Sequence, residues 1–228
     1  SFVLFFVGLY GMTIFRATIR EKSNRIVEVL LASVRPGQLM LSKIIGIGLV
    51  ALVQIIGWAL LLGIGFTVLQ QTIFLDIFDP SNWGGGGPQR LNPLSALVFE
   101  QLNFPFLLIH FILFFLASFL FFGALFSVLG ARSNADADGQ QFLFPLLILV
   151  AFGVFSGVYG VYYPETTLTE VLSYLPFSAP VLAFISLVKG VGIAGYTTIL
   201  LSLLILIVSA FILLSLASNW YRKTILRF

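Results

Sequence analysis

The 228-residue sequence contains no cysteine and only one histidine. Without cysteine the chain cannot form a disulfide, bind a metal through thiolates or use a thiol nucleophile. The sequence also lacks the H-E-x-x-H pattern of zinc proteases and the G-x-S-x-G pattern of hydrolases. The phosphate-binding pattern G-x-x-x-x-G-K-[ST] is missing too, so the sequence predicts neither hydrolytic nor nucleotide chemistry within this chain, and no metal site.

Charge is the next scarce property. Charged residues make up 9% of the chain, whereas a soluble domain carries roughly 25%. Hydrophobic residues make up 59%, including 25 phenylalanines, and the mean hydropathy is +1.08. Because such a small number of charges cannot cover a water-facing surface, we expect lipid to surround most of the chain. The net charge of +3 is small, and we expect no nucleic acid partner.

Long apolar runs occur five times and predict an all-α membrane protein, a bundle of about five transmembrane helices in a single domain over residues 1–228. The first run would reach only about 22 Å as a helix, which is short of the roughly 30 Å hydrocarbon core. We therefore interpret the first helix as truncated and the sequence as a fragment of a longer protein. The predicted spans cover residues 1–15, 39–69, 104–130, 142–163 and 194–220.

The distribution of basic residues predicts the topology. If residues 16–38 face the cytoplasm, alternation places the 131–141 connection and the C-terminal tail there too. Ten basic residues then lie on the cytoplasmic side and two on the opposite side, which is the asymmetry expected of a multi-pass protein of the cell inner (plasma) membrane. The ten are Arg16, Arg20, Lys22, Arg25, Arg35, Lys43, Arg132, Arg222, Lys223 and Arg227, and the two are Arg90 and Lys189.

Residues 179–188 form an apolar stretch that is too short to span a membrane and is flanked by Pro176, Pro180 and Gly190. Stretches of this length are typical of re-entrant or interfacial segments. We place this one at the outer leaflet.

Residues 16–34 are predicted to form an amphipathic helix on the cytoplasmic face. Apolar residues recur at helical spacing on one side, while Glu21 and Arg25 form an i,i+4 pair on the other. Pro36-Gly37 is predicted to end this helix. Such a helix could lie on lipid headgroups or dock a cytoplasmic partner. The mixture of acidic and basic side chains favours docking.

The sequence from residue 21 to 54, EKSNRIVEVLLASVRPGQLMLSKIIGIGLVALVQ, resembles the signature of NatB-like permease subunits of type-2 ABC exporters. In that family a Glu-Lys-x-x-Arg-x-x-Glu-x-Leu-Leu run follows a membrane helix, and Pro-x-Gln-Leu-Met opens the next one. Ala32 and Ser42 depart from the family pattern. The family's first membrane helix and external domain would precede Ser1. The matching residues are Glu21, Lys22, Arg25, Glu28, Leu30, Leu31, Pro36, Gln38, Leu39, Met40, Lys43, Ile44 and Gly46.

The resemblance implies an ATP-driven exporter that moves its substrate outward by alternating access. Residues 16–34 would then be a coupling helix seated in a separate ABC ATPase subunit, which would bind the ATP and Mg²⁺, while this chain holds no cofactor. A second permease chain, identical or different, would complete the transporter, and Na⁺ is the substrate that the resemblance implies. The residues implied in ATPase docking are Glu21, Lys22, Arg25, Glu28, Leu31 and Arg35.

An ATP-independent secondary transporter or channel is the alternative function. Such proteins usually carry charges or broken helices near the membrane midplane, and no charged residue lies near the centre of a predicted span. Gln54 lies near mid-membrane, where it packs between helices or faces a substrate path. We expect His110 to bond a neighbouring group rather than a metal, and the glycines of the second span to allow close helix packing. These glycines are Gly46, Gly48, Gly57, Gly63 and Gly65.

Overall fold

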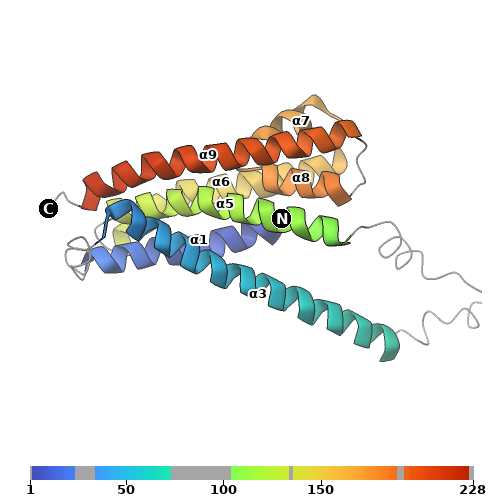
Figure 1. Cartoon of the computed structure of the whole chain (residues 1–228), viewed down its shortest axis with the longest axis horizontal. Coiled ribbons are helices and arrows are strands. Elements are labelled where there is room, and N and C mark those ends of the chain that lie inside the picture. Colours follow the sequence, from blue (N-terminus) through green and yellow to red (C-terminus); the bar gives the residue numbers. More distant parts are fainter. Residues whose placement is uncertain (1, 24–33, 73–103, 134–135, 189–192, 226–228) are drawn as a thin grey trace, which may run out of the picture.

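The computed structural model describes residues 2–23, 34–72, 104–133, 136–188 and 193–225. In these parts of the chain every regular element is an α-helix, which confirms the predicted all-α class. Figure 1 shows the long helices running alongside one another, with the two shortest gathered at one end. The helices are α1 (Phe2–Ser23), α3 (Pro36–Thr72), α5 (Phe104–Arg132), α6 (Asp136–Tyr162), α7 (Thr167–Tyr174), α8 (Ala179–Val188) and α9 (Ile193–Ile225).

Among the described residues, five helices are long and apolar enough to cross a membrane. Each of these helices contains one long apolar stretch, called its apolar window below, and the five windows agree with the five predicted spans. The windows are Val3–Ser23, Pro36–Gly65, Phe106–Arg132, Leu143–Tyr162 and Gly195–Trp220.

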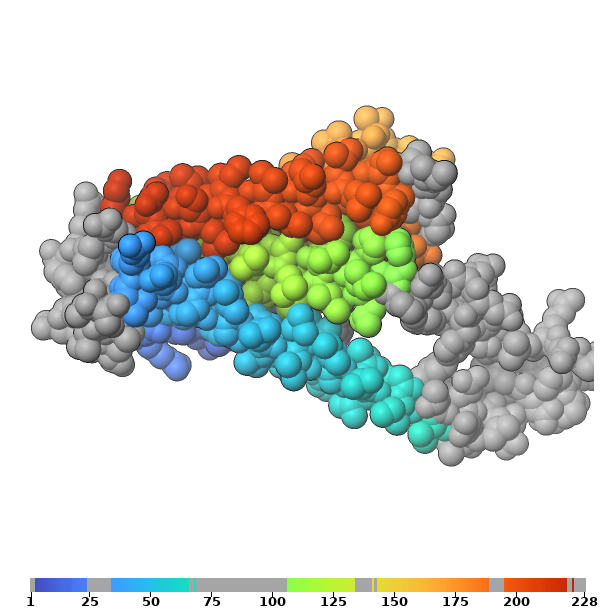
Figure 2. All heavy atoms as spheres, viewed as in Figure 1, coloured from blue at the N-terminus to red at the C-terminus, as the bar shows by residue number. Residues whose placement is uncertain are grey.

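Helix α5 is the centre of the bundle. It packs most extensively against α9 and α1, and 67% of its apolar window is buried, against 22% for α3. On the face drawn in Figure 2, α5 appears as a strip between α9 and α3. Its phenylalanines supply much of the core: Phe114, Phe115, Phe122 and Phe126 are almost fully buried. Large aromatic side chains therefore fill the space between helices whose association in lipid depends on close packing.

The outer helices expose many large apolar side chains, more than a protein surrounded by water exposes. Leu60, Leu61 and Leu62 of α3 are consecutive, and each is 62–64% exposed. Successive residues of a helix point about 100° apart, so α3 is open over most of its circumference there. Figure 1 shows this half of α3 diverging from the bundle. Lipid is the solvent that suits such a surface.

Glycines mark the closest helix crossings, but mostly not the glycines predicted. Gly46, Gly57, Gly63 and Gly65 have open space where a β-carbon would lie, because no other described helix covers α3 at these positions. Only Gly48 meets a neighbour, Phe119 of α5, as expected. The tight positions lie elsewhere, at Gly11, Gly37, Gly123, Gly130 and Gly153.

Two predicted boundaries require correction. Helix α1 does not end at residue 15 but continues to Ser23, so its 22 residues reach about 33 Å. The first eight residues of the predicted 16–34 helix therefore belong to α1, and residues 24–33 lie outside the described part of the chain. Helix α6 begins at Asp136 rather than at residue 142.

The short helices α7 and α8 form a corner between α6 and α9. Thr166 caps α7 by accepting a hydrogen bond from the Thr169 backbone N–H. Ser178 donates to the carbonyl of Leu172 and makes the turn into α8. Helix α8 contacts α5, α6 and α9, and most of its residues are buried. It is too short to span, as predicted, and it packs into the bundle.

Candidate coupling site

An ion pair joins α1 to α3 at the end of the bundle where α1 finishes. The Nζ atom of Lys43 lies 2.5 Å from a carboxylate oxygen of Glu21. The Lys43 side chain is 9% exposed and that of Glu21 is 25% exposed. A charge this far from water needs a partner of opposite sign. The pair therefore fixes the last turn of α1 against the second turn of α3.

Thr18 extends this contact one turn back along α1. Its hydroxyl donates to the carbonyl of Ile14 at 2.9 Å, so its oxygen remains an acceptor, and Lys43 Nζ lies 3.5 Å from it. Thr18 is fully buried. Lys43 is thus held by two groups of α1, one charged and one neutral.

Lys22 makes a second connection, from α1 to the end of α5. Its Nζ donates to the backbone carbonyl of Ala131 at 3.0 Å and to that of Ser133 at 3.4 Å. The last carbonyls of a helix have no partner within the helix and carry partial negative charge. A lysine ammonium supplies both the missing hydrogen-bond donor and a compensating positive charge. Lys22 therefore caps α5 from outside and ties α1 to Ser133, the residue that follows α5.

The beginning of α3 is fixed by its own sequence. Pro36 is the first helical residue, where a missing N–H costs nothing. The Gln38 side chain accepts a hydrogen bond from the Arg35 backbone N–H at 3.3 Å, as the third residue of a capping box does. We predicted that Pro36-Gly37 ends the preceding helix. The two residues form the first turn of α3, which therefore begins three residues earlier than predicted, and the end of the predicted 16–34 helix falls largely outside the described part of the chain.

Gly37 then brings the start of α3 against the end of α9. A β-carbon built on Gly37 would overlap the hydroxyl of Ser218 and would lie 3.2 Å from the Ser218 β-carbon. Glycine permits this approach without displacing the Ser218 hydroxyl. The Pro-x-Gln segment of the sequence therefore serves as a helix start packed against a second helix.

The predicted docking residues fall into three groups. Glu21 and Lys22 point toward α3 and α5, where they hold the helices together. Arg35 is exposed at the start of α3. The other three predicted residues, Arg25, Glu28 and Leu31, lie outside the described part of the chain.

This end of the bundle also presents a basic surface. Arg16 and Arg20 are exposed on the last turns of α1, and Arg132 is exposed at the end of α5. Arg35 and Lys223 add charge at the start of α3 and near the end of α9. A surface of this kind suits anionic lipid headgroups or an acidic protein partner. We call these five residues the basic rim.

Gln54 and His110, the two polar residues weighed within the spans, have different surroundings. Gln54 is exposed on α3, so within one chain its side chain does not enter the bundle. His110 is buried; its Nδ1 donates to the Phe106 carbonyl at 2.9 Å, and its Nε2 lies 3.4 Å from the Tyr196 hydroxyl. In the described ranges no three histidine, cysteine, aspartate or glutamate side chains come together as metal ligands would.

The helical bundle, its lipid-facing apolar surfaces and the basic rim define a multi-pass membrane protein. The sequence matches the family described as ABC-2 family transporter protein over residues 1–218. The chain belongs to this family, as the signature between residues 21 and 54 predicted, and it is a membrane component of a transporter.

The chain is also similar in sequence to two curated proteins. The uncharacterized protein YhaP of Bacillus subtilis is 28% identical over 214 residues, which cover 89% of this chain and 47% of YhaP. The uncharacterized protein MJ1024 of Methanocaldococcus jannaschii is 29% identical over 164 residues, which cover 71% of this chain and 33% of MJ1024. The chain thus spans less than half the length of these relatives. No solved structure matches it.

Proposed function

We propose that this chain is the membrane-spanning part of a permease subunit in an ATP-driven exporter. A separate ABC ATPase subunit binds ATP and Mg²⁺ and drives the permease between inward-facing and outward-facing arrangements. The segment from residue 24 to 33, with its flanks, receives the motion of the ATPase. This side of the bundle faces the cytoplasm, and the basic rim supports that orientation because cytoplasmic loops are rich in arginine and lysine.

The observation that carries the proposal is the anchoring on both sides of this segment. On one side, Glu21 and Lys22 attach the end of α1 to α3 and α5. On the other, Gly37 seats the start of α3 against Ser218 of α9. A push on the connecting segment is therefore delivered to α1, α3, α5 and α9 together. This is the mechanical requirement for converting closure of an ATPase into movement of membrane helices.

A second permease chain, identical or different, completes the proposed transporter. Open space at the glycines of α3 supports this, because a helix face without a partner in one chain is available to another. Sodium is the substrate that the NatB-like signature suggests. Efflux of ²²Na⁺ from proteoliposomes that contain the complex, with and without ATP, tests that substrate directly.

The experiment for the coupling role starts with the protein purified from its native membrane. We expect an ABC ATPase to co-purify and its ATP hydrolysis to depend on the permease. Replacing Glu28 by arginine should remove co-purification and ATP-driven transport while membrane insertion is unchanged. Asp79→Arg is the matched control, since it makes the same change of charge in the segment between α3 and α5.

The two variants separate docking from a general effect of charge. Loss in Glu28→Arg with wild-type behaviour in Asp79→Arg supports the proposal. Full ATP-driven transport by Glu28→Arg, or transport that continues without any ATPase, contradicts it.

A further inference from the structure

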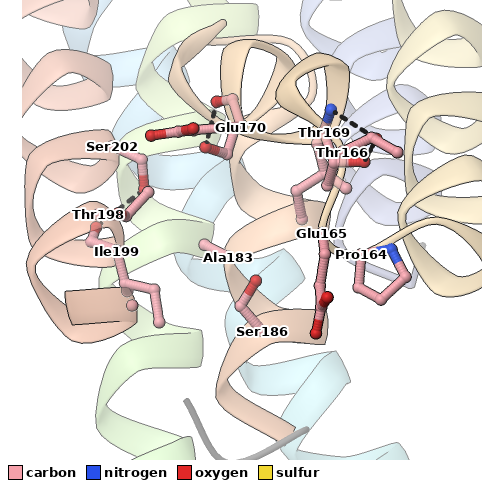
Figure 3. Close-up of a pocket in the computed structure, with 13 residues that line it drawn as sticks. Pro164, Glu165, Thr166, Thr169, Glu170, Ala183, Ser186, Thr198, Ile199 and Ser202 are labelled. Carbon is pink, nitrogen blue, oxygen red and sulfur yellow. Dashed lines mark hydrogen bonds between the residues drawn. The ribbon is translucent and has the colours of Figure 1, made fainter. Parts of the chain in front are cut away.

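A cavity of about 220 Å³ lies at the opposite end of the bundle from the Glu21–Lys43 pair. Helices α7, α8 and α9 and the turn before α7 form its walls (Figure 3). An engineered apolar cavity of about 150 Å³ is large enough to bind benzene. The cavity at this end of the bundle therefore has room for a small organic molecule.

The floor and the mouth of the cavity differ in chemistry. Leu182 and Ile199 are each 2% exposed and give the floor an apolar surface. Glu165 and Glu170 are exposed and lie at the mouth. Figure 3 shows the Glu165 side chain extending toward the end of the cavity where Ser186 lies. A ligand that enters passes carboxylates first and then meets hydrocarbon.

Hydroxyl groups between mouth and floor are oriented as acceptors. Ser202 donates its proton to the backbone carbonyl of Ile199 at 2.8 Å. In the same way Ser173 donates to the backbone carbonyl of Glu170 at 2.6 Å, and Thr169 donates to the backbone carbonyl of Tyr163 at 2.6 Å. A hydroxyl has one proton to donate and two lone pairs. With the protons directed to the backbone, these oxygens offer lone pairs only.

The described lining residues carry two negative charges and no positive charge. They include Glu165 and Glu170 but no lysine, arginine or histidine. A ligand for this cavity must therefore donate hydrogen bonds and carry positive charge. An anion would meet two carboxylates and is excluded.

We propose that this cavity is a binding site for a small amphipathic ammonium compound. The ammonium group pairs with the carboxylate of Glu165 or of Glu170 and donates to the neighbouring hydroxyl oxygens, while the apolar part packs on Leu182 and Ile199. A bare metal ion would leave the apolar floor unused and has no third carboxylate or imidazole ligand in the described residues. The site is separate from the proposed coupling region, and binding to it does not require ATP.

The test uses the purified protein in nanodiscs of zwitterionic lipid, with empty nanodiscs as the blank for partitioning. Isothermal titration with phenethylammonium should give saturable binding. The neutral 2-phenylethanol, which has the same number of non-hydrogen atoms, should bind at least about tenfold more weakly because it lacks the charge. Calcium chloride alone should give no saturable signal.

Variants locate the site. The double variant Glu165→Gln/Glu170→Gln should weaken phenethylammonium binding by about tenfold or more. Asp138→Asn removes one charge in the first turn of α6, at the far end of that helix, and should leave binding unchanged. Ser186→Leu fills the cavity but keeps both carboxylates, so it should also abolish binding.

Two results would overturn the proposal. Equal binding of 2-phenylethanol, or an unchanged affinity in the double glutamine variant, would show that the carboxylates do not select the ligand. Saturable calcium binding that needs Glu165 and Glu170 and that phenethylammonium does not displace would make the site a metal site. The glutamine substitutions lie at exposed positions, so the double variant remains informative even if Ser186→Leu does not fold.

Discussion

Lys43 of α3 and Glu21 of α1 form an ion pair, 2.5 Å from nitrogen to oxygen, although they lie on different helices. The pair sits where the apolar part of α1 gives way to its charged last turns, next to the exposed Arg20. Because Lys43 is nearly buried, its charge depends on Glu21 and Thr18 for compensation. This dependence is measurable.

Replacing Glu21 by glutamine should lower the free energy of unfolding by about 1–3 kcal/mol, since it leaves the Lys43 ammonium buried beside a neutral group. Lys43→Met should cost less, because the remaining Glu21 carboxylate is partly exposed. The double variant should recover most of the loss. Thermal unfolding of the protein in detergent measures all three, and strictly additive losses would mean that the two residues do not interact.

Lys22 offers a separate test at the end of α5. Lys22→Met removes the donor to the Ala131 and Ser133 carbonyls and should destabilise the protein by about 1 kcal/mol. Arg20→Met is the matched control, because Arg20 is exposed two residues away and its loss should change stability by less than about 0.5 kcal/mol. Equal unfolding temperatures for the two variants would contradict the capping role.

The sequence was sufficient to predict the five spans but not helix α7 or the contacts between helices. Runs of apolar residues predicted five spans because the bilayer fixes the length of a helix that crosses it. The pairing of Glu21 with Lys43 leaves no periodic signal, since the two residues are 22 positions apart and on different helices. For the same reason the sequence did not show that Glu21 and Lys22, predicted to dock a partner, also bond α3 and α5 of the same chain.

Glycine positions illustrate a similar limit. The cluster of glycines in residues 46–65 suggested a crossing, but proximity in sequence does not show which face a neighbouring helix covers. Gly130 shares its run of sequence with only one other glycine, Gly123, yet it marks the contact of α5 with α1. The cavity between α7, α8 and α9 was not predicted either, because its serines and threonines come from segments that are brought together only by the fold.

The contrast between Gly130 and Gly57 gives a third prediction. A β-carbon at Gly130 would lie 2.8 Å from the backbone oxygen of Phe15, so alanine there forces α1 and α5 apart and should cost about 1–3 kcal/mol. Within a single chain Gly57→Ala meets nothing within 4 Å, and in the detergent-solubilised monomer it should be neutral or stabilise the helix by up to about 1 kcal/mol. Unfolding temperatures measured side by side compare the two, and a harmless Gly130→Ala would disprove the close crossing.

Because the 228 residues contain no cysteine, no native thiol among them competes with a designed pair. Gly37 and Ser218 are suited to this, since the β-carbon positions are 3.2 Å apart and disulfides need roughly 3.5–4.5 Å, a small adjustment. We expect Gly37→Cys/Ser218→Cys to cross-link on mild oxidation, which faster migration of the unreduced chain in a denaturing gel would show. No cross-link would contradict the packing of α3 on α9.

The same disulfide tests whether this contact must open during transport. If the start of α3 moves relative to α9 in each cycle, ATP-driven transport should fall by about tenfold or more on oxidation and return with dithiothreitol, while each single cysteine variant stays active. If the cross-linked protein transports at the normal rate, α3 and α9 move as one body. Movement of the coupling segment would then have to change the Glu21–Lys43 and Lys22–Ala131 contacts instead. In that case Glu21→Gln and Lys22→Met should impair ATP-driven transport.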